Sequence, residues 1–316
     1  MKLTIVLTVY NKEKYLHRVF DALLNQKDVK EGDYEILAVD DGSKDGSSAI
    51  LANYSKNDSQ VRILTQNNQG LSMARNNGTK EARGKYIWYV DADDTISNNA
   101  VQAICKAIDD NPDVIPIYGK TEGIELTRNE VTADLKTGKD VLNDDHWEQC
   151  GVFWVLRKGF LQANNLSFLP GVYHEDAEFT PRMWYAAKTV KVIPAILYTV
   201  VRDPESITQV PRPKRAFDYL IVSQYLSKFV VENGEVGTLI GKSIDSYTAQ
   251  YINNAFFVII QNDKREQQKL NRAFYDKRKI LLRPLRAAHK MKYRLEAFLF
   301  SLFPNNYVRV YKIIKK

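Results

Sequence analysis

Cysteine is scarce in this sequence of 316 residues, which contains only Cys105 and Cys150. Neither their number nor their spacing predicts a disulfide framework or a zinc site. Cys105 falls on the apolar face of a predicted helix together with Val101 and Ile104, so we expect it to be a core residue.

Long apolar runs are absent as well. No run reaches the roughly 18 residues that a membrane span requires. The first residues, MKLTIVLTVYN, include a short apolar stretch but no small-residue cleavage site. We therefore interpret them as a β-strand and not as a signal peptide.

Two glycine-rich phosphate-binding motifs are also missing. The junction after the first predicted strand lacks G-x-G-x-x-G, and the chain contains no G-x-x-x-x-G-K-[ST]. Their absence argues against a dinucleotide-binding fold and against a P-loop. The phosphates of a bound nucleotide would have to be held by a metal ion and by basic side chains.

Positive charge is distributed unevenly along the chain. Residues 264–316 contain 16 Lys or Arg and 3 Asp or Glu, a net charge of +13. Residues 1–263 contain 29 Lys or Arg and 35 Asp or Glu, a net charge of −6. A basic C-terminal tail on an otherwise acidic chain indicates contact with an anionic surface.

The first part of the chain alternates between strand and helix patterns. Apolar runs predict strands at residues 3–9, 34–39, 61–65 and 85–90, and helical spacing occurs around residues 13–25, 50–54 and 71–82. Short loops between alternating strands and helices are typical of an α/β fold. We therefore predict a Rossmann-like, mainly parallel sheet flanked by helices.

Three acids follow the fourth predicted strand directly. Residues 85–95 read KYIWYVDADDT, so Asp91, Asp93 and Asp94 stand at the end of a buried strand. Carboxylates placed so close together repel one another and are costly to desolvate, which a hard cation such as Mg²⁺ or Mn²⁺ would offset. The alternative is an Asp-rich turn that caps the following helix.

Polar residues also end two other predicted strands, at Tyr10 and at Asp40-Asp41. The carboxyl ends of parallel strands lie at one edge of a sheet, where α/β proteins bind their ligands. An aromatic ring there can stack on a base, and carboxylates accept hydrogen bonds from ribose hydroxyls. For Asp40 and Asp41 taken singly, an Asx-turn is an equally good interpretation.

Five motifs occur in a fixed order: TVYN at 8–11, VDDGSKDGS at 39–47, NQGLSMARNNG at 68–78, ARGKYIWYVDADD at 82–94 and HEDAEF at 174–179. Together they resemble the inverting family 2 glycosyltransferases of GT-A fold that assemble bacterial polysaccharides and glycolipids. The resemblance covers roughly residues 1–205. It implies a nucleotide-sugar donor, most simply a UDP-sugar, and a divalent cofactor, Mn²⁺ or Mg²⁺. It also implies direct displacement of the leaving group at the anomeric carbon by a saccharide or lipid-linked acceptor.

The resemblance also implies contacts with the donor nucleotide. Tyr10 and Asp41 are similar to the family's base and ribose contacts, and Asp40 lies beside them. Arg75 is similar to the arginine that lies near the nucleotide or braces the acids, although a structural ion pair is an open alternative. Arg202 belongs to a Y-x-x-x-R-x-x-x-S segment and is expected near the diphosphate, or else at the surface.

Metal binding and proton transfer are implied at two separate places. Asp91 and Asp93 match the family's DxD motif, with Asp93 as the direct metal ligand and Asp91 acting through ribose or water. Asp94 and Glu175 are expected to support the binding residues without contacting the ligand themselves. The resemblance makes Asp176 the general base, while the alternative is that this acid caps the helix that it begins.

The division into domains follows the change in pattern after the motifs. We predict a catalytic domain at 1–210, with a nucleotide-sugar half at about 1–95 and an acceptor half at about 96–210, and a helical basic region at 211–316. Residues 284–304 join a basic half to an apolar half, which is typical of an interfacial helix on an anionic leaflet. The alternative is an ordinary helix that packs on the rest of the protein.

These features predict a protein of the cytoplasm, peripheral on the inner face of the plasma membrane. Nucleic acid is not expected as a partner, because the catalytic half is acidic and no recognition motif occurs. Processive members of the family that this sequence resembles carry a Q-x-x-R-W motif and several membrane spans. This sequence has neither, so the resemblance implies one transfer per acceptor. Two alternatives remain: a catalytically silent nucleotide-sugar-binding or scaffold protein, and a nucleotidyltransferase.

Overall fold

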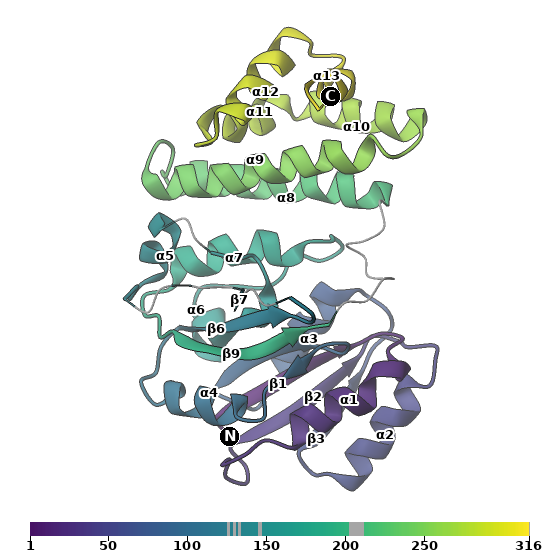
Figure 1. The fold of residues 1–316 in the computed structure, drawn as a ribbon, viewed down its shortest axis with the longest axis vertical. Coiled ribbons are helices and arrows are strands. Elements are labelled where there is room, and N and C mark those ends of the chain that lie inside the picture. Colours follow the sequence, from purple (N-terminus) through teal and green to yellow (C-terminus); the bar gives the residue numbers. More distant parts are fainter. Residues whose placement is uncertain (125–126, 129–130, 132–133, 145–146, 202–211, 316) are drawn as a thin grey trace. The chain divides into compact units, whose positions relative to one another are not determined.

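The structure is a computed structural model that describes residues 1–316 apart from 125–126, 129–130, 132–133, 145–146, 202–211 and 316 (Figure 1). The chain forms two compact units. Unit 1 comprises Met1–Gly171 and Arg182–Asp203, and unit 2 comprises Val172–Pro181 and Pro204–Lys316.

One half of the sheet in unit 1 consists of four parallel strands in the order β3-β2-β1-β4. Their bounds are β1 Leu3–Val9, β2 Tyr34–Asp40, β3 Val61–Thr65 and β4 Tyr86–Asp91. Every residue of β1 and β2 is buried, which requires cover on both faces of the sheet. The predicted α/β class with parallel strands flanked by helices is confirmed.

The other half of the sheet mixes strand directions. Its strands are β5 Thr95–Ile96, β6 Val114–Thr121, β7 Thr127–Arg128, β8 Trp154–Arg157 and β9 Ile193–Val200. Strand β8 lies between β4 and β6 and is antiparallel to both, whereas β9 is parallel to β6. This arrangement extends the sheet beyond the strands that the first 90 residues predict.

The helices of unit 1 alternate with these strands. They are α1 Glu13–Leu24, α2 Ser47–Asn57, α3 Leu71–Glu81, α4 Ala100–Ile108, α5 Gly138–Asp144 and α6 Lys158–Ala163, with a 3-10 turn at Gly151–Phe153. Helix α1 buries one apolar face, which consists of Leu16, Val19, Phe20 and Leu23. The predicted helical spacing therefore corresponds to core packing.

Helix α3 lies very close to the sheet at Gly78. A Cβ atom at this position would stand 2.4 Å from Val6 Cγ1 and 3.1 Å from Val39 Cγ2. Only glycine permits this approach of the helix to β1 and β2. The close packing fixes Arg75, one turn earlier on the same helix, against the sheet.

Unit 2 is helical, as predicted for the C-terminal extension. Its helices are α8 Pro213–Glu232, α9 Leu239–Ile259, α10 Lys264–Asp276, α11 Arg278–Ala287, α12 Met291–Leu302 and α13 Tyr307–Ile314. Helices α8 and α9 lie side by side, and α11 packs against both of them (Figure 1). A buried Arg283–Asp245 ion pair, with a nitrogen–oxygen distance of 2.7 Å, fastens α11 to α9.

Helix α7, Glu175–Ala186, is shared between the units. Its first residues belong to unit 2 and its last residues belong to unit 1. Cys105 is buried in α4, as expected for a core residue.

Candidate active site

The candidate site in unit 1 lies where β1, β2 and β4 end. The strand register pairs Val9 of β1 with Asp40 of β2, and Thr8 of β1 with Asp91 of β4. The carboxyl ends of three parallel strands therefore meet at one edge of the sheet, and the polar residues that follow them are neighbours, as the sequence predicts.

Asp91 is held by groups from two other elements. Its Oδ1 accepts a hydrogen bond from Arg75 Nη2 of α3 at 3.0 Å and one from Thr8 Oγ1 at 3.3 Å. The Arg75 guanidinium is almost fully buried and lies over the rings of Tyr89 and Phe168, 5.8 and 5.3 Å from their centroids. Arg75 therefore forms an ion pair with Asp91, which fits both bracing of the acids and a structural ion pair, two of the three roles that the sequence leaves open.

Asp93 forms an ion pair with Lys12, the residue before α1. Burial, followed by the negative charge of Asp91, raises the pKa of Asp93, and the ion pair with Lys12 opposes this rise. The side chain is 19% exposed, so it remains accessible from solvent. Asp93 is therefore accessible to a ligand and lies close to the negative charge of Asp91.

Asp94 is turned into the protein. One carboxylate oxygen accepts from the Tyr198 hydroxyl at 2.7 Å, and the other accepts from the backbone N–H of Val201 at 2.7 Å. Burial, together with the negative charge of Asp91, raises the pKa of Asp94 to about 8. Tyr198 also accepts from the backbone N–H of Asp91 at 3.2 Å, so this tyrosine of β9 links two of the three acids.

Asp40 and Asp41 organise the turns that follow β2. Asp40 accepts from the backbone N–H of Ser43, three residues on, at 2.9 Å and from the Ser48 hydroxyl. It thus braces the turn after β2, although an Asx-turn would join it to the residue two positions on. Asp41 Oδ1 accepts from the backbone N–H of Gln69 and its Oδ2 from that of Gly70, both at 2.8 Å. Asp41 thereby ties the end of β2 to the start of α3.

Tyr10 differs from these acids because it is exposed. Its side chain is 42% accessible at the end of β1, immediately before Asn11, whose φ of 52° turns the chain towards α1. An exposed ring beside buried acids is suited to stacking on a planar ligand.

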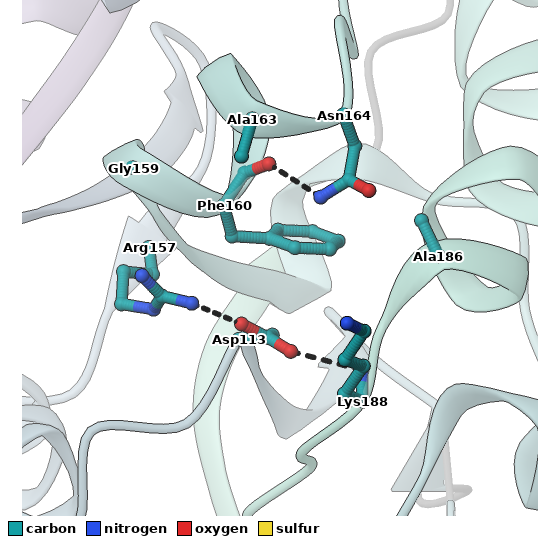
Figure 2. A pocket seen from close by; sticks show the side chains of 8 residues that line it. All are labelled: Asp113, Arg157, Gly159, Phe160, Ala163, Asn164, Ala186 and Lys188. Atoms are coloured by element: carbon teal, nitrogen blue, oxygen red, sulfur yellow. Dashed lines mark hydrogen bonds and ion pairs between the residues drawn. The ribbon is translucent and has the colours of Figure 1, made fainter.

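Other charged residues lie elsewhere. Arg202, the predicted diphosphate contact, lies outside the described residues. Figure 2 shows a pocket of about 290 Å³ in which the Arg157 side chain points towards Asp113, close to Lys188. Arg157 pairs with Tyr86 at the start of β4, so this pocket lies at the opposite end of the strand from Asp91. The predicted site residues do not line it.

Glu175 and Asp176 begin α7 within unit 2. Glu175 is buried, whereas Asp176 is partly exposed and its Oδ1 accepts from the N–H of Ala177 at 2.8 Å. The negative charge of Asp176 contributes, after burial, to raising the pKa of Tyr251 on α9. A carboxylate at a helix N-terminus is stabilised by the helix dipole.

An aromatic stack accompanies this acid pair. The ring of His174 lies on that of Tyr219, with centroids 4.1 Å apart, and Tyr219 in turn stacks on Tyr251 at 5.7 Å. Burial, with the positive charge of Arg215, lowers the pKa of His174 to about 4. His174 is therefore neutral at physiological pH, next to Glu175 in the chain.

Sequence reasoning missed Lys12, Tyr219 and Tyr251. Lys12 directly follows the TVYN motif, so its position next to a motif was the available signal. The two tyrosines lie in helices far along the chain, and nothing in their local pattern indicates a contact with residues 174–176.

Few side chains at the sheet edge could bind a metal ion. Among the described residues, no group of three or more His, Cys, Asp or Glu side chains is arranged to hold a metal ion by itself. Magnesium is commonly bound by one or two carboxylates together with substrate phosphates and water. Asp93 and the partly exposed Asp91 fit that mode, because both are accessible and the pKa of Asp93 is raised.

Comparison with known proteins gives consistent results. The family model described as Glycosyl transferase family 2 matches residues 4–164. EpsJ of Bacillus subtilis, an uncharacterized glycosyltransferase, is 30% identical over 242 residues, which are 73% of this chain and 69% of EpsJ. The poly(ribitol-phosphate) beta-glucosyltransferase of Bacillus spizizenii is 33% identical over 220 residues, which are 67% of this chain and 34% of that protein.

A solved structure is similar over almost the whole chain. Residues 1–349 of S. aureus TarS, in complex with UDP-GlcNAc, match with a TM-score of 0.74 and 19% identity. The match covers 99% of this chain and 90% of the TarS chain. At this identity the likeness shows the fold alone.

Proposed function

The chain belongs to glycosyl transferase family 2 and is a glycosyltransferase of GT-A fold, and from this premise we propose that it transfers a sugar from a UDP-sugar to a hydroxyl group with inversion at the anomeric carbon. The acceptor in this proposal is a saccharide or a lipid-linked saccharide of bacterial polysaccharide assembly. A relative that glucosylates poly(ribitol phosphate) and a fold neighbour bound to UDP-GlcNAc support both parts.

One observation carries the proposal, namely the meeting of Tyr10, Asp41, Asp91 and Asp93 at the carboxyl ends of β1, β2 and β4. The exposed ring of Tyr10 stacks on the uracil base. The carboxylate of Asp41 has about four acceptor positions. Gln66 Nε2 and the backbone N–H groups of Gln69 and Gly70 occupy three of them, which leaves one for a donor from the nucleotide. Asp40 supports this contact by bracing the turn that follows Asp41.

The same edge is proposed to hold the divalent cofactor, Mn²⁺ or Mg²⁺. Asp93 would be the direct protein ligand and Asp91 would act from beside it, with Arg75 and Asp94 keeping the acids in place. When bound, the cation stabilises the negative charge that develops on the departing diphosphate. Lys12, which pairs with Asp93, competes with the cation for that carboxylate.

Asp176 is proposed as the general base. Its carboxylate takes the proton of the acceptor hydroxyl while the acceptor oxygen attacks the anomeric carbon and the bond to the diphosphate breaks. A single displacement converts an α-linked donor into a β-linked product. Glu175, and the stacking of the neutral His174 ring on Tyr219, keep the start of α7 in position.

The domain assignment and location remain part of the proposal. We assign residues 1–210 to catalysis, with the donor half at 1–95 and the acceptor half at 96–210, and residues 211–316 to a helical region. The protein would act in the cytoplasm, on the inner face of the plasma membrane, where lipid-linked acceptors are found.

A nucleotide-release assay tests the function. The protein is incubated with a panel of nucleotide sugars and Mn²⁺, and free nucleoside diphosphate is measured with and without saccharide acceptors. Acceptor-dependent release of UDP is expected. Release of pyrophosphate would instead identify a nucleotidyltransferase, and absence of turnover with every donor would indicate a silent binding protein.

Two variants separate the proposed roles. Asp176→Asn should abolish transfer and leave UDP binding unchanged, because the amide cannot accept the proton. Asp93→Asn should weaken UDP binding in the presence of Mn²⁺. Matched controls are Glu232→Gln and Asp109→Asn, which change exposed carboxylates away from both groups of acids. Full transfer by Asp176→Asn would refute the assignment of the base.

A further inference from the structure

Helix α12 is apolar on two opposite faces. Tyr293, Ala297 and Phe300 are buried, and α12 packs against α11 and α13. Four other apolar side chains of the same helix remain exposed; they are Met291 at 70%, Leu295 at 54%, Phe298 at 60% and Leu302 at 55%. A surface helix of a globular protein normally presents polar residues on the face opposite its core.

These four exposed residues form one continuous row, here called the α12 stripe. They are spaced four, three and four residues apart, which places them on one side of a helix that turns about 100° per residue. Phe303, immediately after the helix, is 50% exposed and extends the row. Contiguous exposed apolar surface of this kind marks a binding site.

Basic residues flank the α12 stripe on both sides. Lys292 and Arg294 are both exposed, and helical geometry places them on opposite flanks of the row. The guanidinium of Arg286 on α11 donates to the Ser301 hydroxyl at 3.0 Å, which adds a third cation along one flank. The polar border of the stripe therefore carries positive charge.

Acidic groups are almost absent from this part of the chain. Residues 277–316 contain 12 Lys or Arg and a single carboxyl side chain, that of Glu296. Glu296 is only 3% exposed and accepts a hydrogen bond from Asn253 Nδ2 at 2.7 Å. A partner of the stripe consequently meets a segment of strongly positive net charge.

We propose that the α12 stripe is a docking surface for an anionic lipid bilayer. Apolar side chains of this size enter the boundary between headgroups and acyl chains, while the flanking Lys and Arg meet anionic headgroups. The helix has 12 residues, too few to span a bilayer, and among the described helices none is long and apolar enough to cross a membrane. Helix α12 therefore lies along the membrane surface.

This inference rests on the proposed location of the protein at a membrane and names the surface that binds it. It does not depend on which sugar transfer the protein catalyses. Charge complementarity favours lipid over a second copy of this chain, since two α12 stripes would bring like charges together. The charge also favours anionic over neutral headgroups.

Vesicle flotation with the full-length protein tests the proposal. Vesicles of phosphatidylcholine containing phosphatidylglycerol should carry the protein, and vesicles of phosphatidylcholine alone should carry about tenfold less or none. Raising the salt concentration should weaken binding to the anionic vesicles. Equal binding to both vesicles, or no binding to either, would overturn the proposal without the need for any variant.

Variants locate the surface. Leu295→Ser with Phe298→Ser should reduce binding to anionic vesicles about tenfold or more, because it removes the central apolar contacts. Lys292→Gln together with Lys290→Gln, which changes the exposed lysine immediately before α12, should reduce binding to anionic vesicles about tenfold. Phe257→Ser, which changes an apolar side chain of α9 that is 52% exposed, is the matched control and should bind as the wild type does.

The results of the vesicle-binding experiments can be distinguished from effects on catalysis. Vesicle binding by the Leu295 and Phe298 variant at the wild-type level, with an unchanged far-UV spectrum, would refute the stripe. If that variant instead changed only the sedimentation coefficient of the free protein, the stripe would be an interface between copies and the proposal would fall. Release of UDP without vesicles should be the same for wild type and both variants, so loss of activity would not be mistaken for loss of docking.

Discussion

The contact between Arg75 and Asp91 predicts a measurable coupling energy. Arg75 is 3% exposed and Asp91 is 33% exposed, with 3.0 Å between Nη2 and Oδ1. Exposed pairs contribute about 0.2–1 kcal/mol, and breaking a buried pair costs about 3–5 kcal/mol. An ion pair with one buried and one partly hydrated partner should lie between these limits, at a coupling of about 2 kcal/mol.

A double-mutant cycle of Arg75→Met, Asp91→Ala and their combination measures this energy. Asp91→Ala should be the more costly single change, because it leaves the more deeply buried charge without its carboxylate. Arg75→Met should cost less, because water can reach Asp91. The double variant should be more stable than the sum of the single effects predicts, by about 2 kcal/mol.

Urea unfolding followed by tryptophan fluorescence is a suitable assay. All four tryptophans, at positions 88, 147, 154 and 184, lie in unit 1 and are buried, so their emission reports on the unit that contains the pair. A coupling below about 0.5 kcal/mol would refute the reasoning, because independent sites add to within that margin. Arg75 would then be a donor contact and not a brace.

Three further predictions concern packing, charge and pH. Gly78→Ala should destabilise unit 1 by about 1–3 kcal/mol in the same urea assay, because its Cβ would overlap a valine of β1; an unchanged midpoint would contradict the close packing. Lys12→Gln should lower the Mn²⁺ concentration that half-saturates UDP binding several-fold, because it removes the cation that competes for Asp93. Lys14→Gln, on the exposed side of α1, should leave that concentration unchanged. A higher Mn²⁺ concentration at half-saturation for Lys12→Gln would show that Lys12 instead binds the phosphates. The pKa of His174 is lowered to about 4, so between pH 6.5 and 4 the unfolded chain binds a proton that the folded chain does not. The free energy of unfolding should therefore fall by up to about 3 kcal/mol as the pH falls through this range. His174→Asn, which tolerates the positive φ of 62°, should flatten this dependence of the urea midpoint measured by far-UV circular dichroism, and an equally steep curve would contradict the assignment.

Much of the sheet edge could be predicted from the sequence because its signals are local. Apolar runs that end abruptly in Asp40 or Asp91 fix both the strand and its last residue, and the parallel topology then brings those ends together. The family resemblance added functional roles that periodicity alone does not provide.

The remaining parts depend on contacts between distant segments. Strand β8 enters the sheet antiparallel between β4 and β6, although its own four residues do not specify either neighbour. The ion-pair partner of Asp93 could not be predicted either, because Lys12 is a polar residue in a loop and only the fold brings it close to the acid. Tyr219 stacks on His174 and on Tyr251 through the packing of unit 2, which no local pattern encodes.

The long sequence separations at the acid cluster have a consequence for biosynthesis. Lys12 meets Asp93 across 81 positions and Tyr198 meets Asp94 across 104, so these contacts require β1, β4 and β9 to be in place together. Contacts of such long range form slowly, since the chain must close large loops first. A nascent chain that has left the ribosome only as far as Asp94 holds the three acids but not Tyr198, which links two of them. Completion of the proposed donor site thus coincides with completion of the sheet.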